Sequence, residues 1–294
     1  MSYQTTLTHA PVLSNEVLSF LEINPTGKYL DGTCGLAGHS EKILSKLSPN
    51  GFLIGTDIDN EAISIAKRKL EKVGDNFHIE KCSYTQSQKV LEKLNIDKVD
   101  GILLDLGLSS LQLDSEDRGF SFMRDANLDM RFDLDSKTRA NDIINRYSEF
   151  ELADIMYHFG EERRSRKISK NIIKNRPIST VNELVEIVRI STPPNKRNKT
   201  LARVFQSFRI AVNSEIDNLK MFLKKYITFL KAGGKIVIIS FHSIEDRIVK
   251  HSFKSSSNKG NLKIITKKPI MASVEEQNYN KRSKSAKLRC AIKL

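Results

Sequence analysis

The sequence lacks the features of a membrane-spanning or secreted protein. No stretch of its 294 residues approaches the roughly 18–20 uncharged apolar positions that a transmembrane helix needs. The opening segment, MSYQTTLTHAPVLSNEV, has neither a basic start nor a long apolar core, so we expect no signal peptide. The cysteines Cys34, Cys82 and Cys290 are too few and too widely spaced for a disulfide framework or a zinc site, so we expect no metal. These absences favour the cytoplasm and no membrane partner.

Acidic residues are scarce in two segments of the chain. The net charge is +13, and residues 247–294 contain 13 Lys and Arg against two acids. Residues 163–209 likewise contain 13 basic residues against Glu183 and Glu186, although an acidic stretch precedes them. Clustered positive charge indicates a polyanionic partner such as a nucleic acid. The alternative is that these stretches are merely solvated surfaces.

Residues 28–105 alternate between strand and helix periodicity. Short apolar runs predict strands at 28–32, 52–57, 76–82 and 99–105. Helical patterns lie between them, at 39–47, 60–73 and 87–94. Asn60 is placed to cap the second of these helices. Strands that alternate with helices at this spacing predict a parallel sheet with right-handed crossovers.

The alternation is then interrupted by about a hundred residues without a convincing strand. Helical patterns replace it, including residues 161–174 and a helix that begins with a capping box from Thr180 to Glu183. An amphipathic helix over 214–231, which we expect Ala232-Gly233-Gly234 to end, leads back to the sheet.

Three further strands are predicted after this helix, at 235–240, 261–267 and 286–294. The chain therefore reads as two domains. Residues 1–112 and 214–294 form a discontinuous α/β domain that binds the cofactor, and residues 113–213 form an inserted, mostly helical domain that recognises the substrate.

A glycine-rich turn follows the first predicted strand. The segment DGTCGLAGHS, residues 31–40, places Gly32, Gly35 and Gly38 between that strand and a helix. Glycines there let the backbone approach a ligand closely, with helix N–H groups facing it. Asp57 ends the second predicted strand, where a carboxylate can accept both hydroxyls of a ribose. Together these features favour an adenosine-containing ligand.

The spacing of the glycines separates two such ligands. A dinucleotide fingerprint spaces them G-x-G-x-x-G around a pyrophosphate, whereas here the spacing is G-x-x-G-x-x-G and Asp31 precedes it. A carboxylate repels a pyrophosphate but attracts the ammonium and sulfonium groups of S-adenosylmethionine. The pattern favours S-adenosylmethionine, although Asp31 can also be read as a turn or helix-entry residue.

Four longer motifs resemble a known family. They are HAPVLSNEVL (9–18), DGTCGLAGHS (31–40), DLGLSSLQLDSEDRGFSFMRDANLDMRFD (105–133) and ISFHSIEDRIVK (239–250). From about His9 to Arg289 the chain is similar to the ribosomal RNA small subunit methyltransferase H family. The resemblance implies a class I (Rossmann-like) methyltransferase fold, with a mostly parallel seven-stranded sheet and an inserted helical domain. It implies methyl transfer from S-adenosylmethionine to the exocyclic N4 of a cytidine in the 16S rRNA decoding region, rRNA nucleotide 1402.

The resemblance also implies residues of the cofactor site. Besides Asp31 and Gly35, the residues expected to bind the cofactor are Ala37, Gly38, His39, Asp57, Tyr84, Asp105 and Gln112. Of these, Asp57 is expected to hold the ribose and Tyr84 to pack on adenine. Three positions depart from the family pattern: Ala37 replaces a glycine, Leu111 a proline, and Asn280-Lys281 an Asn-Pro pair. None of these changes removes a chemical group, so we expect activity, with Ala37 crowding the cofactor if its φ is positive.

The methyl acceptor is expected at the end of the fourth strand, because ligands of such sheets bind at the carboxyl ends of the strands. Related amino-methyltransferases carry an acid-Pro-Pro-aromatic turn there, and DLGLSS takes its place. Ser109, or backbone carbonyls of residues 107–109, is expected to accept hydrogens from N4, with His242 approaching from the fifth strand. Turn chemistry is an equal alternative for Ser109, and a structural hydrogen bond is one for His242.

The segment 117–133 has two interpretations. Its arginines and its Phe120 and Phe122 suit phosphate pairing and base stacking, but they equally suit a packed loop with internal Asp–Arg pairs. The basic segments are expected to hold the phosphates of 16S rRNA, within the small ribosomal subunit. The sequence leaves open whether free rRNA or the assembled subunit is the substrate and whether the chain forms a homodimer.

Three rival functions remain. A DNA amino-methyltransferase is disfavoured by the missing acid-Pro-Pro-aromatic turn, and a nicotinamide oxidoreductase by the glycine spacing. A catalytically silent RNA-binding ribosome assembly factor is disfavoured by Asp31, Asp57, Asp105 and Gln112, because a binding module has no use for a cofactor pocket.

Overall fold

The computed structural model describes residues 11–294, so His9 and Ala10 of the motif above, and the start of the segment examined for a signal peptide, lie outside the described part. The side chains of Ser110 and Asp114 lie outside it too. The chain divides into two compact units: unit 1 combines the chain up to Gly107 with Asn218–Leu294, and unit 2 is Leu108–Asp217. Within residues 11–294, none of the helices combines the length and apolar character that crossing a membrane requires.

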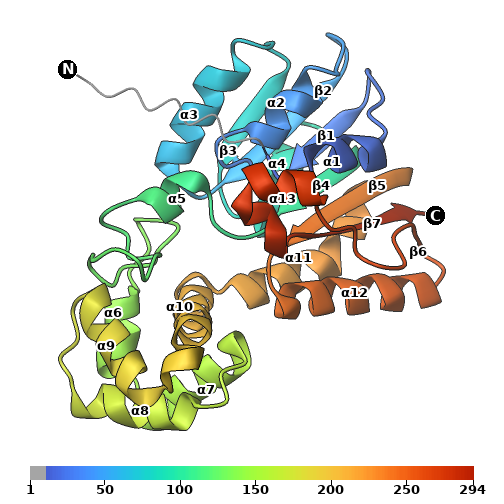
Figure 1. The fold of residues 1–294 in the computed structure, drawn as a ribbon. Helices are drawn as coiled ribbons and strands as arrows, with labels where there is room; N and C mark the ends of the chain where they lie inside the picture. Colours follow the sequence, from blue (N-terminus) through green and yellow to red (C-terminus); the bar gives the residue numbers. More distant parts are fainter. Residues whose placement is uncertain (1–10) are drawn as a thin grey trace. The chain divides into compact units, whose positions relative to one another are not determined.

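Unit 1 is built on a seven-stranded sheet (Figure 1). Its strands are β1 (Lys28–Asp31), β2 (Phe52–Asp57), β3 (Phe77–Lys81), β4 (Val99–Asp105), β5 (Leu230–Ser240), β6 (Leu262–Ile264) and β7 (Lys287–Lys293). Their order across the sheet is β3-β2-β1-β4-β5-β7-β6. The first five pair in parallel, and β7 runs antiparallel to both β5 and β6. This confirms the mostly parallel seven-stranded sheet and places the carboxyl ends of β1, β2 and β4 side by side.

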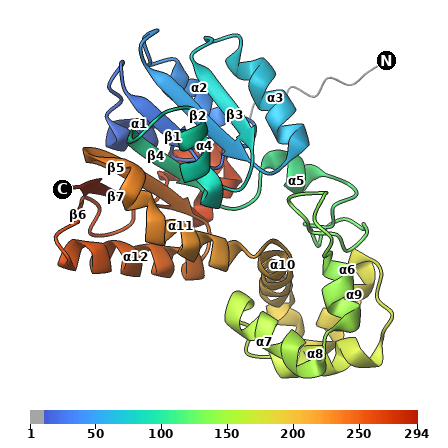
Figure 2. The same cartoon turned by 180° about the vertical axis from the view of Figure 1, so that it is seen from behind.

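Helices cover both faces of this sheet (Figure 2). On one face lie α1 (Ser14–Leu21), α2 (Gly38–Leu44) and α3 (Asn60–Leu70). On the other lie α4 (Ser87–Lys93), α11 (Glu215–Phe229), which enters unit 1 at Asn218, and α12 (Ser243–Asn258). The shorter α13 (Val274–Tyr279), η1 (Tyr84–Gln86) and η3 (Lys281–Ser285) complete the unit. Burial on both faces explains why the parallel strands read as continuous apolar runs such as ILL in β4.

Two local expectations for unit 1 are corrected. Asp59, not Asn60, caps α3, because its carboxylate accepts hydrogen bonds from the first-turn backbone N–H groups. The helix before β5 already ends at Phe229, and Ala232-Gly233-Gly234 lies inside β5. The pairing register of β4 with β5 shifts at this point, and the positive φ of Gly233 (77°) suits glycine, which has no Cβ to clash.

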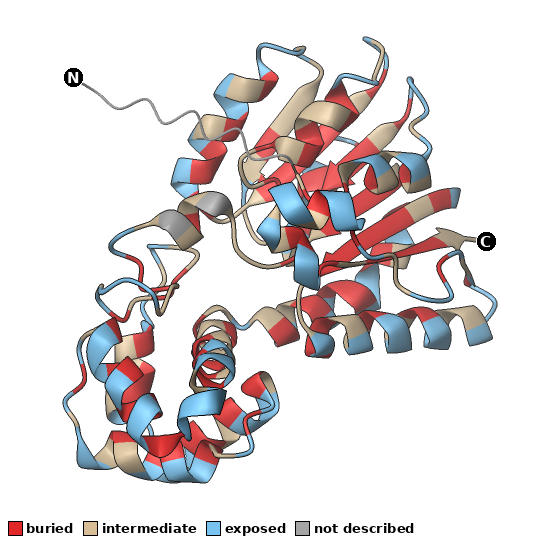
Figure 3. Cartoon of the chain, viewed as in Figure 1, coloured by how far each residue is buried: buried red, intermediate tan, exposed pale blue. Residues whose placement is uncertain are grey.

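Unit 2 is helical. Its helices are α5 (Ser110–Asp114), α6 (Ala140–Arg146), α7 (Glu149–Gly160), α8 (Ser165–Lys174), α9 (Val181–Ser191), η2 (Pro194–Lys196) and α10 (Arg197–Asn213). They bury one apolar core, so each long helix has a buried and an exposed side (Figure 3). Among the described residues of this unit, β pairing is limited to an isolated bridge between Asn127 and Thr180.

The helix boundaries in unit 2 follow local capping. Thr180 and Glu183 form the predicted capping box at the start of α9. The helix predicted over 161–174 begins only at Ser165, because Glu161 adopts a left-handed conformation (φ 51°) and ends α7 instead.

Candidate functional site

The glycine-rich turn between β1 and α2 is held by the neighbouring strands. The backbone N–H of Gly32 donates to the carbonyl oxygen of Leu103 in β4 (2.9 Å). The hydroxyl of Thr56 in β2 donates to the carbonyl oxygen of Gly32 (3.0 Å). The Thr33 hydroxyl accepts from the backbone N–H of Asp105 (2.6 Å). The turn is therefore fixed across the ends of three adjacent strands.

Two residues of this turn have a left-handed backbone. The φ angle is 50° at Gly35 and 58° at Ala37. Glycine adopts this conformation freely, whereas alanine is strained in it because of its Cβ. Ala37 is fully buried and precedes Gly38, the first residue of α2. The alanine at this position thus places a strained residue at the entry to α2.

Asp31 lies at the end of β1 and is almost fully buried. Its Oδ2 accepts from the Ser40 hydroxyl (2.6 Å), and its Oδ1 accepts from the backbone N–H of Thr33 (3.1 Å). Burial raises the pKa of the Asp31 carboxyl, although these hydrogen bonds and nearby His39 act in the opposite direction. The bonds give Asp31 the turn role that the sequence left open, and they fix its carboxylate beside the turn.

Asp57, at the end of β2, contacts the same turn. Its Oδ2 accepts from the backbone N–H of Gly35 (2.7 Å), and its Oδ1 accepts from that of Asp59 (2.9 Å). Burial raises the pKa of the Asp57 carboxyl, with these backbone hydrogen bonds lowering it in part. The structure therefore brings Asp57 and the glycine-rich turn together.

Asp105 ends β4 and faces His39 of α2. The closest atoms of the pair, Asp105 Oδ2 and His39 Nε2, are 3.5 Å apart. Asp105 Oδ1 and both ring nitrogens of His39 are buried and have no hydrogen-bond partner within residues 11–294. Buried polar atoms in folded proteins are nearly always paired, so unpaired ones call for an explanation. A bound polar ligand provides one.

The three strand-end carboxylates carry uncompensated negative charge. Across the described chain, Asp31, Asp57 and Asp105 form no ion pair with lysine or arginine, and the imidazole of His39 lies 3.5 Å from Asp105. Because β1 pairs with both β2 and β4, the three residues end neighbouring strands. Such a site attracts a cation and repels a phosphate. The donor set therefore fits a ligand with an ammonium and a sulfonium group.

Tyr84 follows β3 and lies close to the same turn. A Cβ added to Gly32 would lie 3.0 Å from the Cβ of Tyr84. The Tyr84 ring makes an edge contact with Phe222 of α11, with 5.5 Å between the ring centroids. The predicted aromatic residue is therefore brought to the glycine-rich turn, with its ring partly packed in the core.

Ser109 and Gln112 lie in unit 2, at the start of α5. The Ser109 hydroxyl accepts from the backbone N–H of Gln112 (3.2 Å), and Gln112 Oε1 accepts from that of Ser109 (3.0 Å). This reciprocal pair is a capping box. The structure thus gives Ser109 the turn role that the sequence left as an alternative, and it places both residues outside the unit that holds the carboxylates.

His242 has a structural role in unit 1 as the N-cap of α12. Its Nδ1 accepts from the backbone N–H of Glu245 (3.4 Å). Its Nε2 lies 3.1 Å from Glu245 Oε1, although this pair is not aligned as a hydrogen bond. Glu245 is itself buried and accepts from the backbone N–H of Phe241 (2.9 Å). These contacts match the structural alternative for this histidine.

The segment 117–133 is packed. Phe120 and Arg131 are both buried, as is Arg118. Two hydrogen bonds of 2.8 Å join the Arg131 guanidinium to the Asp129 carboxylate, and the Phe120 ring stacks on Phe132. These contacts match the packed loop with internal Asp–Arg pairs for Arg118, Phe120 and Arg131, whereas Arg124 is exposed.

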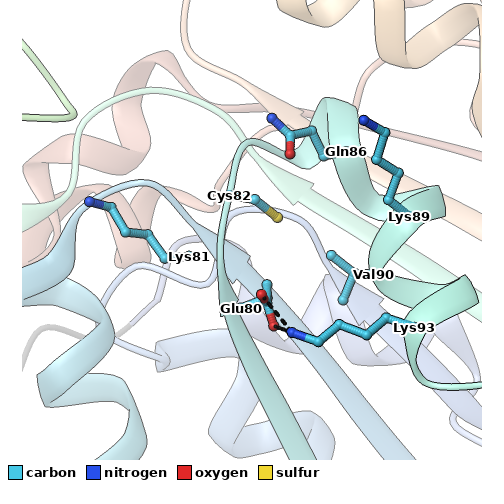
Figure 4. Close-up of a pocket in the computed structure, with 7 residues that line it drawn as sticks. All are labelled: Glu80, Lys81, Cys82, Gln86, Lys89, Val90 and Lys93. Carbon is cyan, nitrogen blue, oxygen red and sulfur yellow. Dashed lines mark hydrogen bonds and ion pairs between the residues drawn. The ribbon is translucent and has the colours of Figure 1, made fainter. Parts of the chain in front are cut away.

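A pocket of about 150 Å³ lies along β3 and α4 (Figure 4). Its lining residues are Glu80, Lys81, Cys82, Gln86, Lys89, Val90 and Lys93. Ligand pockets usually measure about 300–1,000 Å³. This pocket is smaller and its lining is mainly positive, which disfavours a cationic cofactor. None of the predicted site residues lines it.

Sequence reasoning missed two residues of the turn. Ser40 donates to Asp31, and Thr33 joins the turn to the end of β4. Both stand inside the motif DGTCGLAGHS, but small hydroxyl residues are common in turns. Their partners depend on which strands are neighbours, and this is visible only in the folded sheet.

The strand order, the antiparallel β7 and the glycine-rich turn followed by a strand-end acid define a class I methyltransferase. The chain belongs to the MraW methylase family, whose model matches residues 6–294. It is 48% identical to the ribosomal RNA small subunit methyltransferase H of Caldicellulosiruptor saccharolyticus, over 97% of this chain and 99% of that protein. The protein of the same name from Thermosipho africanus is 46% identical, over 97% and 98% respectively.

Solved structures are more distant. An rRNA methylase from Streptococcus thermophilus is 10% identical and has a TM-score of 0.46, over 95% of each chain. The strand order, rather than this weak likeness, defines the fold.

The cofactor of this methylase is S-adenosylmethionine. The uncompensated carboxylates and the unpaired buried atoms of Asp105 and His39 fit its two positive charges. The predicted cofactor residues of unit 1 all lie on or beside the glycine-rich turn, at the strand ends.

Proposed function

We propose that this protein methylates the exocyclic N4 of a cytidine in 16S rRNA, at rRNA nucleotide 1402 in the decoding region. Its relatives are named ribosomal RNA small subunit methyltransferase H, and this supports rRNA of the small subunit as the substrate. The observation that carries the proposal is Asp105, at the end of β4 beside the glycine-rich turn, with an unpaired buried oxygen.

The cofactor residues act by binding and orientation. S-adenosylmethionine, when bound, supplies a methyl group on a sulfonium sulfur, and attack of a nitrogen on the methyl carbon releases the sulfur as a neutral thioether. Asp31 neutralises the ammonium group, and Asp57 accepts from the ribose hydroxyls. Tyr84 packs against adenine, while Gly35, Ala37, Gly38 and His39 line the turn. Asp105 completes the cofactor contacts of unit 1, and a cofactor contact of Gln112, which lies in unit 2, stays a prediction.

The turn after β4 receives the cytosine. Its N4 lone pair is delocalised into the ring, so acceptors for the N4 hydrogens favour the bent geometry in which the nitrogen can attack. We assign this role to the backbone carbonyls of residues 107–109, since Ser109 and His242 have capping roles. The side chains of Ser109 and His242 are the alternative acceptors. Alignment and desolvation supply the rest of the acceleration.

The two units divide the work. Unit 1 contains the carboxylates and binds the cofactor, and unit 2 recognises the RNA, in the bacterial cytoplasm. The positive net charge, +13, supports a polyanionic substrate.

The test uses labelled S-adenosylmethionine with small ribosomal subunits that lack this methylation, then nuclease digestion and nucleoside analysis. We expect the label in N4-methylcytidine. Label in another nucleoside contradicts the assigned atom. Cofactor binding without transfer to either subunits or free 16S rRNA contradicts the assigned substrate.

A further inference from the structure

Residues 163–174, which contain helix α8 of unit 2, include no acidic residue. Residues 163–174 read RRSRKISKNIIK, with six basic residues. The buried side of the helix consists of Ser165, Ile168, Ser169 and Ile172. Its basic residues are therefore excluded from the core and lie on the side away from it (Figure 3).

Four of these residues form one continuous face, which we call the α8 surface: Arg166, Lys167, Lys170 and Lys174. All four are exposed. At about 100° per residue, they fall within an arc of about 100° opposite the buried side. Arg166, Lys170 and Lys174 follow one another at intervals of four residues, a row about 12 Å long at 1.5 Å per residue.

The α8 surface is unpaired. None of its four residues forms an ion pair with any residue between 11 and 294. Like charges four residues apart destabilise a helix, and Arg166–Lys170 and Lys170–Lys174 are two such pairs. The arrangement therefore does not serve the stability of the helix itself, and a polyanion would relieve the repulsion.

The neighbouring helix has the opposite charge. α7 packs against α8 and contains Glu149, Glu151 and Asp154 but no lysine or arginine. A polyanion is thus attracted to α8 and repelled from α7. The positive surface continues at the end of α9, where Ser191 accepts from the side-chain amide of Asn171 in α8 (2.8 Å). The elements that follow add the exposed Lys196 of η2 and Lys199 at the start of α10.

In the second basic segment part of the charge is already paired, as Arg189, Arg203 and Arg209 are in the first. Arg289 donates to Asp246 at 2.6 and 3.2 Å, and Lys287 lies 3.9 Å from the same carboxylate. The ammonium of Lys293 donates to the backbone carbonyls of Ile227 and Leu230. These cations make contacts within unit 1. The net charge of the segment therefore overstates the number of its positive charges that can contact RNA.

We propose that the α8 surface binds the phosphate backbone of the RNA substrate, with little dependence on base sequence. The inference rests on the proposed function in taking rRNA as the substrate. Exposed, unpaired Lys and Arg at regular spacing position an RNA through its phosphates, whereas base identity is read elsewhere.

The experiment compares two full-length variants that lose the same number of charges. The first carries Arg166→Gln, Lys167→Gln, Lys170→Gln and Lys174→Gln. The matched control carries Lys250→Gln, Lys254→Gln, Lys263→Gln and Lys267→Gln, which are exposed lysines of the second basic segment. Affinity for deproteinised 16S rRNA is measured from about 50 to 200 mM salt, the range over which phosphate contacts are strongly screened.

We expect the α8 variant to bind this RNA at least about 10-fold more weakly at low salt, with a slope of log K against log salt shallower by roughly three to four units. The control is expected to keep the wild-type slope within about one unit. Equal losses in both variants, or an unchanged slope in the α8 variant, overturn the proposal. So does an α8 variant that binds naked RNA normally but binds assembled subunits poorly, because the surface then contacts protein.

Two further measurements keep the interpretation secure. Neutralising like charges is expected to leave the melting temperature unchanged or slightly raised, so a lowered one would mean that these residues serve the fold. Methylation by the wild type is scored in the same preparations. If the α8 variant loses the salt dependence of RNA binding but the wild type forms no N4-methylcytidine, the α8 proposal stands and the proposed function fails. If the wild type forms N4-methylcytidine but the α8 variant keeps the salt dependence, the proposed function stands and the α8 proposal fails.

Discussion

The strand ends of unit 1 and the α8 surface of unit 2 carry opposite charges that the fold leaves unpaired. At the strand ends, Asp31, Asp57 and Asp105 have no lysine or arginine partner in the described chain. On α8, four basic residues have no acidic partner there. Some other charges are paired within the chain, as Arg289 is with Asp246. Charge that a protein does not compensate internally indicates the charge of its ligand: a cation in unit 1 and a polyanion in unit 2.

The largest effect is expected from removing the charge of Asp31. Asp31→Asn keeps the shape and the hydrogen bond from Ser40 but loses the negative charge. Hydrogen bonds to charged groups contribute about 1.5–3 kcal/mol, so S-adenosylmethionine affinity should fall roughly 10- to 100-fold. Calorimetric titration with the cofactor measures this.

The matched control is Asp97→Asn, an exposed aspartate next to Lys98, for which we expect no change. Wild-type cofactor affinity in Asp31→Asn would contradict the claim that the uncompensated negative charge of unit 1 binds a cationic ligand.

A fall in pH should also affect ligand binding by the two regions differently. Burial raises the pKa of both Asp31 and Asp57 above the ordinary 3.8, so these groups gain protons as the pH falls from neutral towards that value. A cationic cofactor favours the ionised carboxylates, so its affinity should fall by up to about 10-fold per pH unit below the raised pKa. The α8 surface contains no carboxyl group, so RNA affinity should not fall over the same range.

The same shifts affect the free protein. A raised carboxyl pKa contributes stability below the unfolded value, and this contribution is lost as the pH rises through the raised pKa. Because the cofactor favours the ionised carboxylates, its binding should raise the melting temperature more at pH 7 than near pH 4. In Asp31→Asn the difference between the two pH values should shrink, and an undiminished difference would contradict the assignment to this carboxyl.

The two capping residues provide a smaller and sharper test, with one in each unit. Ser109→Ala and His242→Ala should each lower the free energy of unfolding by about 1 kcal/mol, because each removes a helix cap. Ser109→Asp and His242→Asn retain a capping oxygen and should recover most of that loss.

Turnover decides between the two acceptor assignments. If the backbone carbonyls of residues 107–109 hold the N4 hydrogens, the capping variants should keep turnover within a few-fold at saturating cofactor. A large loss of turnover in folded Ser109→Ala or His242→Ala would assign the acceptor to the side chain.

The smallest effect concerns the strained turn residue. Ala37 has a φ of 58°, which costs an alanine about 1–2 kcal/mol. Ala37→Gly should raise the free energy of unfolding by up to about 1 kcal/mol, because the added flexibility of the unfolded chain offsets part of the relief. Denaturant unfolding measures this, and a destabilised variant would contradict the strain. Gly51→Ala cannot serve as a glycine-to-alanine control for this variant, because the added Cβ would collide with a carbonyl oxygen.

Much of the fold could be predicted from the sequence because periodicity is local. The four strands before the insert lie within a residue or two of their predicted bounds, and the strand-end acids Asp57 and Asp105 followed from them. The stop before β5 could not be predicted, since a glycine pair suits a helix end and a register shift equally. Helix α7 was missed although Ser148 and Glu151 form a capping box at its start, and its end could not be placed because it depends on the left-handed conformation of Glu161, a non-glycine residue.

The site was predictable in its residues but not in its contacts. The motif DGTCGLAGHS indicated the turn, yet the roles of Ser40 and Thr33 depend on strands distant in sequence. The charge count gave both basic segments equal weight. Only the folded chain shows that Arg289 and Lys293 are used internally while the α8 surface is unpaired.

The most direct test crosses both ligands with both regions. Affinity for S-adenosylmethionine and for deproteinised 16S rRNA is measured on Asp31→Asn and on the fourfold α8 variant. We predict that Asp31→Asn loses cofactor affinity alone and that the α8 variant loses RNA affinity alone. Loss of both ligands in either variant, or loss of the other ligand, would contradict the division of charge between the two units.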